Sequence, residues 1–111
     1  MKTIDFIDIQ LKEYIESIRP PEEVRDQVDI WYLYKNNVVE IFEIRPKWDD
    51  KKVSQHFPIA RAKFVKSNDV WKIYWLSGNN KWLPYTPKPI VGKLYEFIEL
   101  IKKDKSGCFW G

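Results

Sequence analysis

The sequence predicts a single α+β domain over residues 1–111, with an antiparallel sheet of four or five strands flanked by an N-terminal and a C-terminal helix. Three observations predict this class. Apolar residues recur every three or four positions near both ends of the chain, they alternate at every second position in the middle, and turn signals rich in Asn, Asp and Gly separate the alternating segments. Helices at both ends of an antiparallel meander are expected to pack on one sheet face.

The first element is a helix predicted over residues 3–18. Its apolar stripe consists of Ile4, Ile7, Leu11, Tyr14 or Ile15, and Ile18. Arg19-Pro20-Pro21 ends this helix, because a residue that precedes proline is disfavoured in the α region.

A hairpin is predicted next, because the apolar period changes from 3.6 to 2 after about residue 25. The first strand alternates Val28, Ile30, Tyr32 and Tyr34 with Asp29, Trp31, Leu33 and Lys35. Asn36-Asn37 fits a two-residue turn, since asparagine tolerates the positive φ that such turns require. The return strand, residues 38–45, has Val39 and Ile41 on one face and Glu40, Phe42 and Ile44 on the other.

Residues 46–58 are predicted to form a long polar connection, because Pro46 is expected to end the second strand and Pro58 lies at the far end of the segment. A connection of this length is long for a compact domain, and such loops are often functional or mobile.

A three-stranded meander is predicted over residues 59–65, 70–76 and 81–85. Ala60, Ala62 and Phe64 share one face of its first strand, with Arg61 and Lys63 opposite, and Trp71, Ile73 and Trp75 share one face of its second strand. Pro84 favours an edge position for the last strand, because proline has no N–H to donate to a neighbouring strand.

The final helix is predicted to follow the linker 86–89 and to end near Lys103. Its apolar stripe consists of Val91, Leu94, Phe97, Ile98 and Ile101. Gly107 stops any extension of the helix. The apolar residues Phe109 and Trp110 are expected to pack back onto the domain.

The composition is that of a globular protein, with 44% hydrophobic and 32% charged residues. A single cysteine, Cys108, excludes an internal disulfide, and a reducing cytoplasmic location is expected. The sequence has no long apolar run, so we expect no signal peptide and no membrane helix, which needs roughly 20 residues. No membrane partner is therefore expected.

Residues suited to catalysis or metal binding are few. His56 is the only histidine, and it does not form a zinc-type cluster with Cys108, which is interpreted as a small hydrophobic residue beside Phe109 and Trp110. We therefore predict no catalytic residue, metal or cofactor. A metal-dependent nuclease-like enzyme remains an alternative, because Glu43-Ile44-Arg45 loosely matches a Glu-x-Lys strand.

Positive charge is concentrated in residues 45–81, which hold nine Lys and Arg but three Asp. Arg61, Lys63 and Lys72 alternate with inward residues, so they are expected to project from one open sheet face, with Trp31, Tyr74 or Trp82 beside them. Basic side chains neutralise phosphates and aromatic rings stack on bases, which is how single-stranded nucleic acid is held. Nucleic acid is therefore the first predicted partner. The alternative interpretation of these residues is a solvated outer face and an aromatic core.

Another protein is the second predicted partner, because the eighteen Trp, Tyr and Phe residues exceed what a domain of this size readily buries. An oligomerisation module is part of this alternative. The sequence does not specify the oligomeric state.

Several motifs together resemble the bacterial domain-of-unknown-function family 3024 over nearly the whole chain. They are Arg19-Pro20-Pro21 with Arg25, Glu43-Ile44-Arg45-Pro46, Ala62-Lys63-Phe64, Trp71-Lys72-Ile73-Tyr74-Trp75, Lys81-Trp82 with Tyr85, Asp104, and Gly107-Cys108-Phe109-Trp110-Gly111. The family carries His where this chain has Leu83, which weakens a catalytic role for that position.

The resemblance implies no activity, substrate or cofactor, but it implies that the motif residues act together in one compact domain. Their polar members, Arg19, Arg25, Glu43 and Arg45, are candidates either for a binding site or for a structural ion-pair network in which Glu43 pairs with Arg25. The predicted binding residues are Arg25, Glu43, Arg45, Arg61, Lys63, Lys72 and Trp82.

Overall fold

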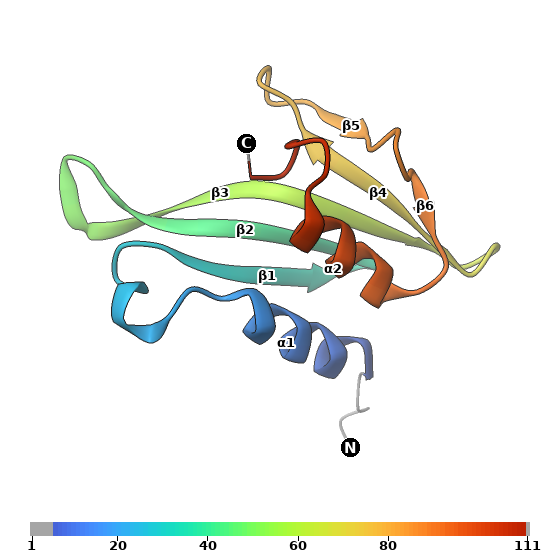
Figure 1. The fold of residues 1–111 in the computed structure, drawn as a ribbon, viewed down its shortest axis with the longest axis horizontal. Helices are drawn as coiled ribbons and strands as arrows, with labels where there is room; N and C mark the ends of the chain where they lie inside the picture. The colour runs from blue at the N-terminus through green and yellow to red at the C-terminus, as the bar shows by residue number, and fades with distance from the viewer. Residues whose placement is uncertain (1–5, 111) are drawn as a thin grey trace.

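The computed structural model describes residues 6–110 and confirms the α+β class (Figure 1). The helical elements are α1 (Phe6–Ile18), the 3₁₀ helix η1 (Glu22–Val24) and α2 (Leu94–Lys103). The strands are β1 (Asp29–Lys35), β2 (Val38–Lys47), β3 (Asp50–Val65), β4 (Val70–Leu76), β5 (Trp82–Pro84) and β6 (Ile90–Val91). The part of the first predicted helix that includes Ile4 lies outside the described residues.

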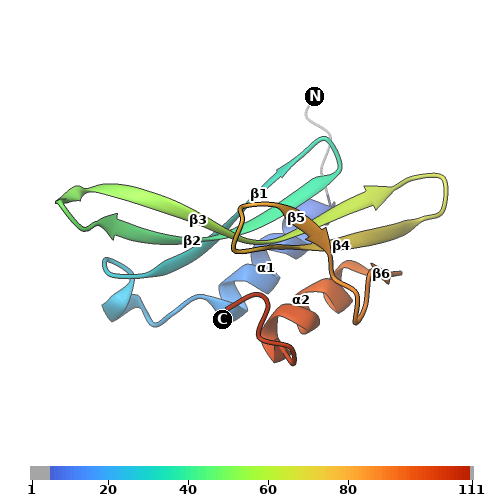
Figure 2. The same ribbon diagram turned by 90° about the horizontal axis from the view of Figure 1, so that it is seen from above.

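The strands form one antiparallel sheet in which β1-β2-β3-β4-β5 follow the order of the sequence, and β6 pairs with β4 outside this path. Both helices lie on the same face, as Figure 2 shows. We call this face the helix side and the opposite face the open face. The first turn is the predicted one, with Asn36 and Asn37 at φ 53° and 63°.

The core fills the space between the sheet and the helices, because strand residues on the helix side alternate with polar residues on the open face. The sheet contributes Ile30, Val39, Ile41, Ala60, Ala62, Trp71 and Ile73, and the helices contribute Leu11, Ile15, Leu94, Phe97, Ile98 and Ile101. The predicted stripes of the two helices therefore supply most of the helical half of the core.

The outer edge of β4 is shared by two short strands. β5 pairs with Tyr74–Leu76, and β6 pairs with residues 71–72. A linker and the start of the last helix had been predicted at the position of β6. Between them, the Tyr85 N–H donates to Ile73 O and the Ile73 N–H donates to Pro89 O, both at 2.9 Å. The edge of β4 is thus hydrogen-bonded along much of its length.

The predicted connection over residues 46–58 is wrong, because this segment forms the end of a long hairpin. β1 pairs with β2 only as far as Ile44, and β4 pairs with β3 only as far as Ala60, so residues 45–59 extend beyond both neighbours. We call residues 45–59 the arm. In the arm each strand has a single neighbouring strand. About half of its backbone N–H and C=O groups therefore point away from that neighbour and are not part of the hydrogen-bond ladder.

Both prolines are accommodated within the strands for this reason. Pro46 lies in the two-stranded part of the sheet, beyond the end of β1. Pro58 pairs with Phe42, and the register then moves to Ile41 paired with Ala60, which leaves Ile59 as the extra residue of a β-bulge. Proline is tolerated at edges and bulges because no ladder hydrogen bond is lost there.

The predicted start of the last helix at Val91 is also wrong. Val91 is buried in β6, and α2 begins at Leu94 because the Glu96 carboxylate accepts hydrogen bonds from the N–H groups of Gly92 and Lys93, both at 2.9 Å. The helix ends at Asp104, which takes the left-handed conformation at φ 37°.

The C-terminal residues pack onto the molecule, as predicted. The Asp104 carboxylate accepts hydrogen bonds from the N–H groups of Phe109 and Trp110, at 3.1 and 2.9 Å. The Trp110 indole N–H donates to Ile101 O at 2.9 Å, and the Phe109 ring lies 4.8 Å from that of Tyr85. Phe109 is thereby buried in the core.

Candidate functional site

A row of three lysines crosses one end of the open face. Lys35 pairs with Val38, Val38 with Lys63, and Lys63 with Lys72, so these residues share one register position on β1 to β4. Because neighbouring strands lie about 4.8 Å apart, the Lys63 and Lys72 side chains are direct neighbours. Among residues 6–110 none of the three lysines forms an ion pair. We call Lys35, Lys63 and Lys72 the lysine row.

Arg61 occupies the next register position on the same face, between Glu40 on β2 and Tyr74 on β4. One terminal nitrogen of its guanidinium group donates to Glu40 Oε2 at 2.9 Å, and its Cζ lies 4.3 Å from the ring centroid of Trp82. The guanidinium group is therefore held between a carboxylate and an aromatic ring, a geometry that favours arginine.

The Arg61 Nε is buried and has no hydrogen-bond partner in the described part of the chain. The side chain as a whole remains 34% exposed. Arginine has five N–H donors, and the hydrogen bond to Glu40 uses one of them. The remaining donors give this position a capacity to bind an additional acceptor.

Beyond Arg61, on the side away from the lysine row, the open face carries half-buried aromatic side chains. Trp31 pairs with Phe42, and Trp82 of β5 pairs with Leu76, one register position beyond Tyr74. The Phe42 ring stacks on the His56 ring at a centroid distance of 4.5 Å. The open face thus changes from lysines at one end, through Arg61, to aromatic rings.

Glu43 and Arg45 lie on the helix side, away from this surface. Glu43 pairs in register with the buried residue Ile30, and the Arg45 Nε donates to Glu43 Oε1. Both residues line a shallow hollow with Phe109 and Trp110, so two motifs of the family resemblance meet here. The observed partner of Glu43 is Arg45 rather than Arg25.

Arg25 belongs to a third location, the connection between α1 and β1. Its Nε donates to Pro20 O at 3.0 Å. Arg19 donates to both carboxylate oxygens of Asp29, at 2.9 and 2.8 Å, and also pairs with Glu16. Hydrogen bonding to Arg19 lowers the pKa of Asp29, because the guanidinium group stabilises the ionised carboxylate. These arginines hold the end of α1 beside β1.

The predicted binding residues are therefore divided among three places. Arg61, Lys63, Lys72 and Trp82 come together on the open face, whereas Glu43 with Arg45, and Arg25, lie elsewhere. Lys35 and Glu40 belong to the open-face group but were absent from the predicted set. Alternation within each strand indicated their face, but their proximity to Arg61 and Lys63 depends on the register between strands.

Residues 6–110 contain no cluster of side chains suited to a metal ion and no helix that could span a membrane. No group of three His, Cys, Asp or Glu side chains in this part of the chain is arranged to hold a metal ion. Neither α1 nor α2 has the length and apolar character required to cross a bilayer.

Comparison with known proteins yields one match. The model of a family described as a domain of unknown function, DUF3024, matches residues 2–111. No curated protein and no solved structure matches the chain.

Proposed function

We propose that this chain, which belongs to the DUF3024 family, is a binding module whose open face holds single-stranded nucleic acid. The observation that carries the proposal is the lysine row beside Arg61 and the aromatic side chains of the same face.

The lysine row supports the proposal through its charge. Like charges directly opposite each other on neighbouring strands destabilise a sheet, and Lys63 and Lys72 are such a pair. A phosphate group placed over them removes this repulsion and releases condensed counterions from the nucleic acid. The Arg61 side chain, 34% exposed, adds a further positive charge close to the row.

The aromatic rings favour single strands over duplexes. The half-buried rings of Tyr74 and Trp82 provide planar apolar surface on which unpaired bases stack. Stacked base pairs in a duplex have no free face to offer, so a duplex would use only the basic side chains. The guanidinium plane of Arg61, stacked on Trp82, adds another surface suited to an unpaired base.

Fluorescence anisotropy with labelled RNA and DNA oligonucleotides of about 12 nucleotides tests the proposal. The affinity is measured between about 50 and 200 mM salt for the wild type and for Lys63→Gln/Lys72→Gln. We expect the slope of log affinity against log salt to fall in magnitude by about 1.4, because each phosphate contact on a single strand contributes about 0.7.

Two control variants distinguish contacts on the open face from the effects of net charge and of losing an exposed aromatic ring elsewhere. Lys12→Gln/Lys102→Gln removes the same charge from the two helices and should leave the slope unchanged. Trp82→Leu should weaken binding by about 1–3 kcal/mol, the value of one stacked base. Trp48→Leu, at the exposed end of the arm, should not weaken it. Wild-type affinity in both open-face variants, or no binding at low salt, would contradict the proposal.

A second candidate function is self-association through the arm. Within residues 6–110 its two strands pair only with each other, so their outer edges present unpaired backbone groups. Trp48, Val53 and Phe57 are exposed on it. A second copy of this chain offers matching strand edges, and removal of residues 46–54 from the arm tests this function through the molar mass in solution.

A further inference from the structure

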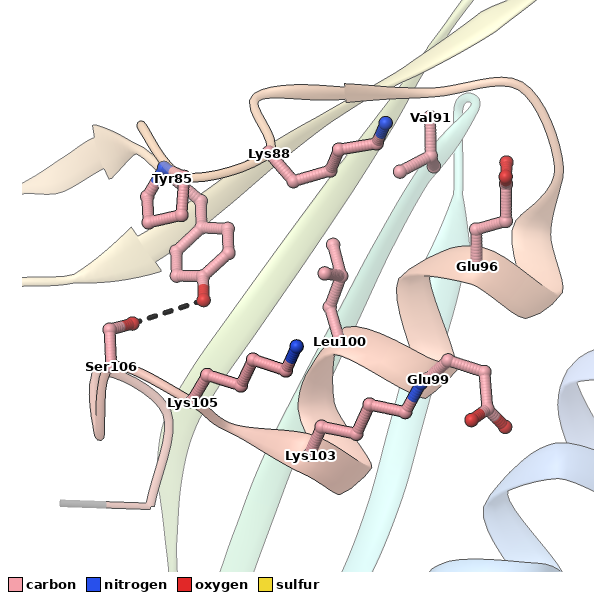
Figure 3. A pocket seen from close by; sticks show the side chains of 10 residues that line it. Tyr85, Lys88, Val91, Glu96, Glu99, Leu100, Lys103, Lys105 and Ser106 are labelled. Atoms are coloured by element: carbon pink, nitrogen blue, oxygen red, sulfur yellow. Dashed lines mark hydrogen bonds between the residues drawn. The ribbon is translucent and has the colours of Figure 1, made fainter.

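A cleft of about 410 Å³ lies between α2, the segment 85–91 and the turn that follows α2 (Figure 3). Its lining shares no residue with the lysine row or with Arg61 and its neighbours. A volume of this size is within the range of small-molecule sites, roughly 300–1,000 Å³.

The inner surface of the cleft is apolar. Tyr85 and Val91, each 2% exposed, line it together with Pro87 and Leu100. These side chains come from the segment 85–91 and from α2, and they present mainly carbon atoms. A ligand bound there requires an apolar body.

The charges around the cleft are unequally engaged. The Glu96 carboxylate is occupied by the N–H groups of Gly92 and Lys93, and Glu99 pairs with Lys102 at 3.8 Å. Lys88, Lys103 and Lys105 also line the cleft, and none of them forms an ion pair with another described residue. The free charges at this site are therefore positive.

Figure 3 shows the Lys88 and Lys105 side chains extending over the cleft from opposite walls, with Leu100 between them. An anionic group at the opening can approach both ammonium groups while the remainder of the ligand contacts the apolar wall. The arrangement combines charge complementarity with apolar contact.

The walls are held together before any ligand binds. The Tyr85 and Ser106 hydroxyl groups share a hydrogen bond of 3.0 Å, which joins the segment after β5 to the turn after α2. Asp104 accepts hydrogen bonds from the N–H groups of Phe109 and Trp110 and so orders the same turn. A preformed cleft reduces the conformational entropy lost on binding.

We propose that this cleft binds a small amphipathic organic anion, with its carboxylate or sulfonate group at Lys88, Lys103 and Lys105 and its apolar body against Val91 and Leu100. The proposal is independent of nucleic-acid binding by the open face.

Calorimetry with octanoate, octylammonium and octanol as probes tests the proposal, because the three share an apolar chain and differ in the charge of the head group. We expect saturable binding of octanoate, and binding of the other two that is weaker by at least about tenfold, since charge-assisted hydrogen bonds to the ammonium groups are absent. Chemical-shift changes in NMR spectra should centre on Tyr85, Val91 and Leu100.

The matched variants are Lys88→Gln/Lys103→Gln/Lys105→Gln and, as a control, Lys51→Gln/Lys52→Gln/Lys66→Gln. Both remove three positive charges from exposed positions, so neither disturbs the core. The cleft variant should lose about tenfold or more in octanoate affinity, and the control should keep it. Equal binding of octanoate and octylammonium, full affinity in the cleft variant, or shift changes confined to the open face would overturn the proposal.

Discussion

At the residue scale, Arg19 and Asp29 join the end of α1 to the start of β1. The contact uses both carboxylate oxygens, and the Asp29 side chain is 16% exposed. The Arg19 Cζ also lies 5.2 Å from the Trp31 ring centroid. The pair therefore stabilises the connection between a helix and the edge of the sheet. This contact gives Arg19, the arginine of the first family motif, a structural role.

The lowered pKa of Asp29 predicts how this stabilisation depends on pH. A carboxylate with a depressed pKa in the folded state stabilises the protein above its unfolded pKa of about 3.9, and this contribution is lost as the pH falls through the folded value. Asp29→Asn should lower the free energy of unfolding by about 1–3 kcal/mol near neutral pH, because Arg19 loses its ionised partner.

Urea denaturation of wild type and variant over a series of pH values measures this effect. The difference between them should narrow as the pH falls below about 4. Asp26→Asn, at an exposed position, should differ from the wild type by less than about 0.5 kcal/mol throughout. A constant difference at all pH values would show that ionisation of Asp29 is not its source.

Arg61 illustrates how a residue in the predicted site acquires a defined geometry only through its neighbours. Glu40 and Trp82 hold the guanidinium group from β2 and β5, so its orientation depends on strands on both sides of β3. The exposed lysine side chains of the row lack such constraints. In the proposed interface, Arg61 therefore supplies directional contacts and the lysines supply charge.

At the element scale, the arm is the feature that differs most from the sequence-based expectation. Its β3 strand is exposed from Asp50 to Phe57, so it contributes little to the core. Replacing residues 46–54 by Asn-Gly connects Arg45 and Gln55, which are paired in register, through a two-residue hairpin turn. The shortened chain should keep a free energy of unfolding within about 0.5 kcal/mol of the wild type.

Light scattering of the same variant tests self-association. If the arm joins two copies of the chain, the wild type should show a dimer at high concentration and the shortened chain should remain monomeric. A wild type that is monomeric at every concentration, or a shortened chain that still dimerises, would contradict the second candidate function. Loss of cooperative unfolding would contradict the structural independence of the arm.

At the scale of the whole molecule, the C-terminal residues close the space between α2 and the segment after β5. Phe109 is 4% exposed and contacts Tyr85, which is buried beside β4. Phe109→Ala should lower the free energy of unfolding by about 3–5 kcal/mol, because it leaves a cavity in the core. Chemical denaturation measures this loss.

Trp48→Ala is the matched control for this substitution, since the Trp48 side chain is 88% exposed. It should change the free energy of unfolding by less than about 0.5 kcal/mol. A loss in Phe109→Ala no larger than that of the control would mean that the C-terminal residues are not part of the core in solution.

The local part of the fold was predictable because it depends on residues close in sequence. Alternation assigned Ile73 and Trp75 to the helix side and Arg61 and Lys63 to the open face, and Asn36-Asn37 specified a tight turn. The family resemblance was likewise predictable and is confirmed by the match over residues 2–111.

The prolines were misleading because their effect depends on surroundings that no local pattern contains. Pro46 and Pro58 are typical of loops, yet both lie in strands of the arm, one beyond the end of β1 and the other at a bulge. Local pattern also failed to predict β6. A strand of two residues is too short to show an alternating pattern, and its pairing with β4 depends on tertiary structure.

The sequence by itself therefore determined the α+β class, the two helices and the face on which the residues of β1 to β4 outside the arm lie, because these follow from short-range periodicity. Only the tertiary structure decided which of these residues meet. The register between β1, β2, β3 and β4 assembled the lysine row, and the packing of the C-terminal turn against the segment 85–91 formed the cleft. Contacts between residues distant in sequence depend on chain pairing and packing, and periodicity within a segment does not encode them.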